Sequence, residues 1–349
     1  MLDKVIFVLM LILIFACVVI IHEWGHFIMA KKNGVLVHEF AMGMGPKVWS
    51  VQKGETLYSI RLLPIGGFCS MEEEVGSSDN PKAMSSKKPW QKFLIVVAGA
   101  VMNFILAWIL MSIVVGYIGC NTNEIATLQE NMPAVEAGLQ VGDKITAING
   151  EKVKKLADLS NALSKEEATY NLVIKHVDGK EEAIALNTKK QEDGVARFGF
   201  TVTQNHFNIL YNLESGFVLM VRTVEMIWRS LIQLLTGEVG MDQMAGIVGV
   251  VDQTSKQWDQ SVRIGGLGYA VIDLLYVGAI LSANLGIFNL LPFPALDGGR
   301  LVFIIIEMIR GKAVSAEKEG AVHFIGMVLL MLLTVVVLYN DLIRMGIGR

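Results

Sequence analysis

Four long stretches of the chain are apolar and carry few charged residues. They cover about residues 5–30, 93–119, 269–309 and 321–339. A helix needs about 20 apolar residues to cross a hydrocarbon core of about 30 Å. We therefore predict a polytopic α-helical membrane protein with four transmembrane helices.

The segment between the second and third stretches has the composition of a soluble domain. Between residues 121 and 205, 23 of 85 residues are charged, and short runs with β character alternate with glycine-containing turns. A short helix is expected over 156–163. We predict one mainly β domain over residues 120–205.

Residues 207–236 mix large apolar side chains with Arg222, Glu225 and Arg229. This mixture is typical of an amphipathic helix that lies in the membrane interface. The glycine-rich residues 237–268 are interpreted as a loop or lid. The predicted segments are 1–119 with two transmembrane helices, 120–205 with the β domain, 206–268 with the interfacial helix and loop, and 269–349 with the last two transmembrane helices.

A β-hairpin is predicted after the first transmembrane helix. Residues 48–52 and 56–62 have β character, and residues 43–46 contain glycines and a proline that break any helix. Two interpretations stay open. The hairpin is a small cytoplasmic element, or it is a membrane-associated sheet whose edge receives an extended substrate strand by β-augmentation.

Charge and composition narrow the class of protein further. The chain has 53% hydrophobic and 18% charged residues, which excludes an ordinary soluble protein, and its net charge of −3 gives no reason to expect nucleic acid. Nine Lys/Arg residues lie between Lys31 and Lys92, so the positive-inside rule places this segment in the cytoplasm. Both termini and the β domain are then expected outside the cytoplasm.

A His-Glu-x-x-His motif lies inside the first apolar stretch. The i, i+4 spacing puts His22 and His26 on one helix face, where two imidazoles can bind zinc while Glu23 lies beside a water molecule. Polar groups are costly at membrane depth and usually functional there. We predict a metalloprotease site near the cytoplasmic side, and a buried hydrogen-bonded histidine cluster is the structural alternative. The three cysteines lack Cys-x-x-Cys spacing, so no thiolate metal site is predicted.

The third apolar stretch is interrupted by residues 289–300, which include two prolines, glycines, an amide and a carboxylate. Unwound backbone at this depth must line a polar cavity or be buried in protein. Catalytic zinc generally has three protein ligands, and Asp297 has the matching depth to be the third. Asn289 is expected to donate to the substrate backbone or to an oxyanion. Gly99 and Asn103, spaced i, i+4 on the second helix, are interpreted as a helix-packing stripe rather than as catalytic residues.

Together these motifs resemble the site-2 proteases, zinc metalloproteases that cut transmembrane segments, and specifically the bacterial type that acts in regulated intramembrane proteolysis. The resemblance rests on residues 22–26, the glycine-rich 43–46, the Pro-x-Gly-Gly element at 64–67, the second-helix segment 99–104, and the Asn-x-x-Pro-x-Pro-x-Leu-Asp-Gly-Gly signature at 289–299. It implies Zn²⁺ as cofactor, Glu23 as catalytic base, and His22, His26 and Asp297 as ligands. The substrate-binding positions expected from it are Asn289, Pro292, Gly43, Gly45, Gly66 and Gly67.

The resemblance also implies partners and a location. Its substrates are single-span membrane proteins already shortened by another protease, such as anti-sigma factors, and remnant signal peptides. Residues 133–150 are similar to the Pro-Ala-x-x-Ala-Gly-Leu-x-x-Gly-Asp-x-Ile…Ile-Asn-Gly pattern of a PDZ domain, in a single copy. We expect a multi-pass protein of the bacterial cell membrane, in contact with the lipid bilayer, whose PDZ domain binds a C-terminal peptide or excludes substrates with large ectodomains.

Two alternatives from other classes were weighed against this interpretation. A non-proteolytic membrane PDZ scaffold would explain the soluble domain, but loss of Glu23 or Asp297 would be expected, and both are present. An ion transporter would explain buried ionisable groups and a broken helix, but it predicts internal repeats. No similarity beyond hydrophobicity relates the first and third apolar stretches.

Overall fold

The molecule consists of two compact units. Its structure is a computed structural model, which describes residues 2–75, 79–153, 167–190, 196–205, 208–238, 240 and 246–344. The first, called the membrane unit here, comprises Met1–Val114 and Leu213–Arg349, and the second, called the PDZ-like unit, comprises Val115–Asn212. Each unit is described by itself.

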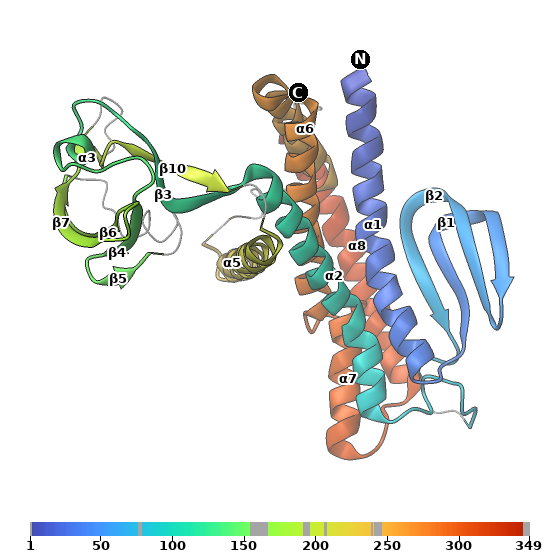
Figure 1. Cartoon of the computed structure of the whole chain (residues 1–349). Coiled ribbons are helices and arrows are strands. Elements are labelled where there is room, and N and C mark those ends of the chain that lie inside the picture. The colour runs from blue at the N-terminus through green and yellow to red at the C-terminus, as the bar shows by residue number, and fades with distance from the viewer. Residues whose placement is uncertain are drawn as a thin grey trace. The chain divides into compact units, whose positions relative to one another are not determined.

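Among the described residues, four helices are long and apolar enough to cross a membrane, which confirms the predicted number of spans. They are α1 (Leu2–Lys32), α2 (Pro89–Ile118), α6 (Ile247–Leu290) and α8 (Ala316–Arg344). Figure 1 shows α1, α2, α6 and α8 as the helical bundle of the membrane unit. Phe7, Leu11 and Ile14 of α1 are buried in one apolar cluster with Trp258 and Leu274 of α6.

The predicted loop over 237–268 is wrong from Ile247 onward, because α6 begins at that residue. The carboxylate of Asp341, on α8, accepts hydrogen bonds from the backbone N–H groups of Gly246 and Gly249 at 3.0 and 2.9 Å, and so satisfies free donors at the start of α6. Within α6 the backbone leaves helical geometry at Gly266, where φ is +75°. The glycines therefore mark a kink in a helix rather than a loop.

The amphipathic stretch forms α5 (Ile209–Leu235). Its start is fixed to α2, because the indole Nε1–H of Trp108 donates to the carbonyl of Leu213 at 2.8 Å and the Trp108 ring meets Phe217 edge to face. Met220 is buried one turn further along, in a cluster with Ala107 and other residues of α2 and α6.

The predicted hairpin is much longer than its sequence signal. Strands β1 (Val37–Lys53) and β2 (Thr56–Met71) are antiparallel, and both bend, so that residues 37–42 pair with 67–71 on one side and with 57–60 on the other. The bends contain glycines with φ between +83° and +85°, a backbone region that costs other residues free energy: Gly43, Gly45 and Gly66. Segment 67–71 is thus an edge of the folded-over sheet.

A short helix, α7 (Asp297–Arg310), follows the interruption of the third apolar stretch. Two ion pairs hold it: Lys92 of α2 with Glu307 at 2.9 Å, and Arg300 with Glu74, in the loop after β2, at 2.6 Å. Helix α7 is therefore tied to both the second membrane helix and the segment that leaves the sheet.

The PDZ-like unit is mainly β, as predicted. Its strands are β3 (Cys120–Leu128), β4 (Lys144–Ile148), β5 (Glu151–Lys152), β6 (Thr169–Lys175), β7 (Glu181–Asn187), β8 (Lys189–Lys190), β9 (Ala196–Arg197) and β10 (Phe200–Asn205), with the short helix α3 (Pro133–Glu136). The main sheet has the order β10-β3-β4-β6-β7, with β5 paired to β4. Ile125, Ile145, Leu172 and Ile174 are fully buried in its core. The helix expected over 156–163 lies outside the described residues.

Candidate metal centre

The two histidines of α1 meet at one point. His22 and His26 are one helical turn apart, their rings lie edge to face, and their Nε2 atoms are 3.2 Å apart. Both residues are buried, at 6% and 7% exposure. The apolar residues around the motif make this part of α1 a membrane helix, and the i, i+4 spacing puts both rings on the same side of it.

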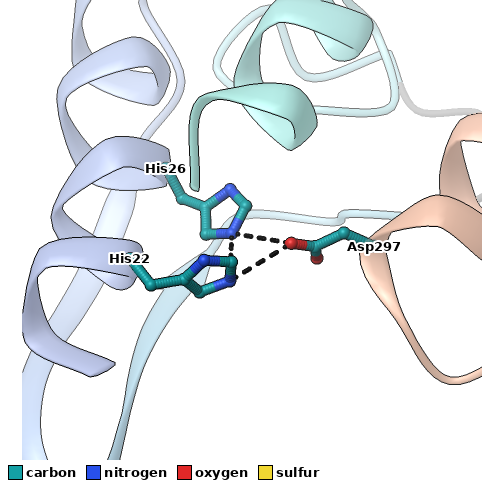
Figure 2. Close-up of side chains that lie close together, drawn as sticks. All are labelled: His22, His26 and Asp297. Carbon is teal, nitrogen blue, oxygen red and sulfur yellow. Dashed lines mark hydrogen bonds and ion pairs between the residues drawn. The ribbon is translucent and has the colours of Figure 1, made fainter. Parts of the chain in front are cut away.

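Asp297, the first residue of α7, supplies a third atom at the same point. Its Oδ2 lies 3.2 Å from the Nε2 of His22 and 3.2 Å from the Nε2 of His26 (Figure 2). No hydrogen bond is formed by this buried oxygen within the described part of the chain. Residues 275 positions apart in the chain are thus brought within the reach of one ion.

This triangle of donor atoms fits zinc. Ligands bound tetrahedrally at 2.0–2.1 Å are roughly 3.3–3.4 Å from one another, close to the observed 3.2 Å. Two imidazole nitrogens and one carboxylate oxygen are also a donor set that zinc accepts, and three protein ligands leave one position open for reaction. The alternative of a hydrogen-bonded histidine cluster explains the carboxylate less well, because a single oxygen faces both rings without a hydrogen bond.

Helix α2 forms the wall behind the histidines. His26 donates from Nδ1 to the backbone carbonyl of Ile95 at 2.8 Å. A Cβ added to Gly99 would collide with both imidazole rings, so only glycine leaves room for them. Asn103 is fully buried, and its side-chain nitrogen lies 3.3 Å from Nδ1 of His22. The packing interpretation of Gly99 and Asn103 is therefore incomplete, because both residues contact the histidines as well as forming the helix interface.

Glu23 is held by the edge of the sheet. The backbone N–H of Cys69, in β2, donates to Oε2 of Glu23 at 3.0 Å. Gly67 also lies beside α1, where an added Cβ would be 3.7 Å from Cγ of Glu23. The edge segment 67–71 thus lies against the motif helix, as the second interpretation of the hairpin requires, and binding of a substrate strand there stays a prediction.

The remaining predicted positions fall into two groups. The side-chain nitrogen of Asn289, near the end of α6, lies 3.1 Å from Nε2 of His22 and so borders the donor triangle. Pro292 lies in the turn between α6 and α7, five residues before Asp297. The other glycines, Gly43, Gly45 and Gly66, lie at the bends of the sheet.

A contact that sequence reasoning missed fixes the turn before Asp297. The backbone N–H of Ala295, whose φ is +77°, donates to Nδ1 of His323 on α8 at 2.9 Å. Pro294 packs so closely on Gly326 that a Cβ there would collide with it. No motif surrounds His323, and the only sequence signal is a lone histidine at the start of the fourth apolar stretch.

Among the described residues, Cys69 is not part of the group of side chains whose ligand atoms lie close enough to share a metal ion. Burial raises the pKa of its thiol to about 12, so the sulfur stays protonated at neutral pH. Cys17, the other cysteine whose side chain the structure describes, is a free thiol on the exposed surface of α1.

In the membrane unit, the histidine pair of a His-Glu-x-x-His motif and a carboxylate that follows a broken helix meet at one buried point. This combination defines an intramembrane metallopeptidase. The comparison with known families agrees with this class. The chain belongs to peptidase family M50, whose profile matches residues 10–333. It is a multi-pass, zinc-dependent metalloendopeptidase of the site-2 protease type, so the scaffold and transporter alternatives are set aside.

Relatives match this chain over nearly their whole length. The chain is 33% identical to the regulator of sigma-W protease RasP of Bacillus subtilis, over 97% of the chain and 98% of the relative. It is also 33% identical to the zinc metalloprotease RasP of Bacillus licheniformis, over 97% of the chain and 99% of the relative. Among solved structures, the PDZ domain of an SdrC-like protein from Listeria innocua is similar to 25% of the chain and covers 100% of its own, with 24% identity and a TM-score of 0.22.

Proposed function

We propose that this protein hydrolyses peptide bonds inside the transmembrane segments of single-span membrane proteins. The observation that carries the proposal is the buried triangle formed by His22, His26 and Asp297, with all three edges at 3.2 Å. Because His22 and His26 lie on a helix that crosses the membrane, the bond that reaches the triangle belongs to a segment at membrane depth.

The residues of the centre have separate roles in this proposal. His22, His26 and Asp297 hold the zinc ion, which when bound lowers the pKa of water and polarises the scissile carbonyl. Glu23 takes the proton from the attacking water and returns it to the leaving amine. The N–H of Cys69 holds the carboxylate of Glu23 in place. Asn289 donates a hydrogen bond to the carbonyl oxygen as negative charge develops on it.

The substrate is expected to bind in an extended form. A helix protects its own peptide bonds, so the segment must unwind before water reaches a carbonyl. Segment 67–71 is a sheet edge next to Glu23, and an unwound strand can pair with such an edge. The glycine bends at Gly43, Gly45 and Gly66 set the course of this edge, and Pro292 is expected to border the bound strand.

The substrate class follows from the relatives and the charges. One relative is named for regulating sigma-W, which supports anti-sigma factors, shortened by an earlier cut, as substrates, with remnant signal peptides as a second group. The Lys/Arg-rich segment between α1 and α2 supports a cytoplasmic location for the sheet. Both termini and the PDZ-like unit then lie outside the cytoplasm of a bacterial cell, and the centre lies near the cytoplasmic side.

Cleavage of a defined substrate tests this proposal. Purified protein in detergent is incubated with a single-span model substrate, and the products are identified by mass spectrometry. Wild type is expected to cut within the membrane segment, and Glu23→Gln is expected to leave the substrate intact. Cuts confined to the soluble parts of the substrate, or equal cutting by both proteins, would contradict the proposal.

A further inference from the structure

Helix α2 presents three groups to the histidines from one face. Ile95, Gly99 and Asn103 are spaced i, i+4 and i+8, so they lie above one another on the helix. The carbonyl of Ile95 contacts His26, Gly99 leaves room for both rings, and the amide of Asn103 contacts His22. Each histidine therefore has its own polar partner on α2.

The partner of His26 fixes where the proton of its neutral ring lies. A carbonyl oxygen can only accept, so the bond of 2.8 Å to Ile95 places the proton on Nδ1 of His26. The lone pair is then on Nε2, which faces the donor triangle. This is the tautomer that a metal ligand requires.

Asn103, the partner of His22, does not fix the ring proton in the same way. The nitrogen of the Asn103 amide faces Nδ1 at 3.3 Å and can only donate, which would place the ring proton on Nε2. That proton would point into the triangle, where Nε2 of His26 and Oδ2 of Asp297 are each 3.2 Å away. Meanwhile the amide oxygen of Asn103 is buried and has no hydrogen-bond partner among the described residues, which is unfavourable for a buried acceptor.

A half-turn of the Asn103 amide resolves the conflict at His22 and gives the amide oxygen a donor. It exchanges the oxygen and the nitrogen, so that Nδ1–H of His22 donates to Oδ1 of Asn103 and the lone pair of Nε2 faces the triangle. We propose that Asn103 is a positioning residue that selects the metal-binding tautomer and the ring orientation of His22. This inference rests on the proposed zinc site.

Helix packing alone does not account for the side chain of Asn103. The contact with α6 is made by its backbone, because the hydroxyl of Ser282 donates to the main-chain carbonyl of Asn103 at 2.8 Å. The side chain is thus left for His22, although it is fully buried in a helix where an apolar residue would pack equally well. Asn289 does not replace it, since its nitrogen lies nearer to Nε2 of His22, at 3.1 Å, than to Nδ1, at 3.5 Å.

Zinc affinity of the full-length protein in detergent tests the proposal. Dissociation constants are measured by competition with a chromophoric chelator for wild type, Asn103→Leu, Asn103→Ala and Asn103→Asp. Loss of an outer partner of a metal-bound histidine weakens metal binding by about 10–100-fold, which is expected for the leucine and alanine variants. Asn103→Asp keeps an acceptor oxygen and is expected to bind zinc nearly as tightly as wild type.

Ser282→Ala is the matched control, because it removes a hydrogen bond at the same helix contact but not the partner of His22. Thermal unfolding of each zinc-free variant shows that it is folded. Unchanged affinity in Asn103→Leu and Asn103→Ala, or an equal loss in Ser282→Ala, would overturn the role of Asn103. A wild-type protein that binds no zinc would instead overturn the proposed function itself.

Discussion

At the scale of single residues, the metal centre depends on two glycines, because a side chain would not fit at either position. Gly25 of α1 faces the backbone carbonyl of Ala98 so closely that a Cβ would collide with it. Gly99, which follows Ala98 in α2, lies just as close to the imidazole rings of His22 and His26. These contacts let α1 and α2 approach until both histidines fit between them, as small residues do in membrane helix pairs.

Gly99→Ala is therefore expected to disturb the metal centre without unfolding the bundle. The added methyl group would lie 2.6 Å from Cε1 of His22 and closer still to Nε2 of His26, so the rings must move apart. We expect zinc content per chain to fall well below that of wild type. Gly320→Ala on α8 is the control, because nothing lies within 4 Å of its added Cβ. Equal zinc content in the two variants would contradict the geometry.

In the PDZ-like unit, His176 is expected to titrate above its ordinary range. A hydrogen bond with Asp143, over 3.0 Å between Nδ1 and Oδ2, raises the pKa of His176. The pair therefore stabilises the folded unit below about pH 6.5, the pKa of a free histidine. This contribution is lost as pH rises through the folded-state pKa.

An NMR titration of histidine-labelled protein measures that pKa directly. We expect a midpoint above that of a free histidine in wild type and a lower one in Asp143→Asn. A wild-type midpoint at or below about 6.5 would show that the hydrogen bond does not hold the proton.

At the scale of elements, the position of α7 decides whether Asp297 reaches the histidines. The helix has only 14 residues and is held by its neighbours. Lys92 of α2 pairs with Glu307 near its end, and His323 of α8 accepts from the turn before its start. Two membrane helices, α2 and α8, thus contribute to placing one carboxylate.

The ion pair between Lys92 and Glu307 is expected to matter because both side chains are largely buried, at 7% and 17% exposure. Removing one partner of a buried pair costs about 3–5 kcal/mol, whereas replacing both by apolar groups is close to neutral. We expect Lys92→Met to lower the free energy of unfolding in mixed micelles by that amount, and Lys92→Met with Glu307→Leu to recover most of it.

Lys82→Met provides the comparison for that experiment. Its pair with Glu55 is exposed, at 52% and 54%, and such pairs contribute about 0–1 kcal/mol. A loss in Lys92→Met no larger than in Lys82→Met would show that the buried pair does not hold α7.

The sequence predicts those elements whose signal is local. Apolar length identifies the four spans, and the i, i+4 histidines identify the face of α1 that carries the site. The start of α6 was missed because its cap, Asp341, lies on another helix more than 90 residues away. The strands were predicted too short because glycine bends within β1 and β2 look like strand ends. The contact of His323 with the turn before Asp297 and the contact of Asn103 with His22 both depend on how the helices pack. No local sequence pattern predicts this packing.

At the scale of the whole molecule, a soluble unit is inserted between two membrane helices that both contribute to the centre. If it excludes substrates with large ectodomains, then removing residues 121–203 and joining the ends with a flexible linker should let the enzyme cut a full-length single-span protein that wild type leaves intact. Both enzymes should cut the pre-shortened substrate. If the deletion variant does not cut the full-length substrate, the proposal that the PDZ-like unit excludes large ectodomains is contradicted.

The central claim is that zinc held by His22, His26 and Asp297 works together with Glu23 as base. Zinc per chain and cleavage of a single-span substrate should be measured on the same preparations of wild type, Glu23→Gln and Asp297→Leu. We predict one zinc and cleavage for wild type, one zinc without cleavage for Glu23→Gln, and little zinc and no cleavage for Asp297→Leu. A full complement of zinc in Asp297→Leu, or cleavage by Glu23→Gln, would contradict the account.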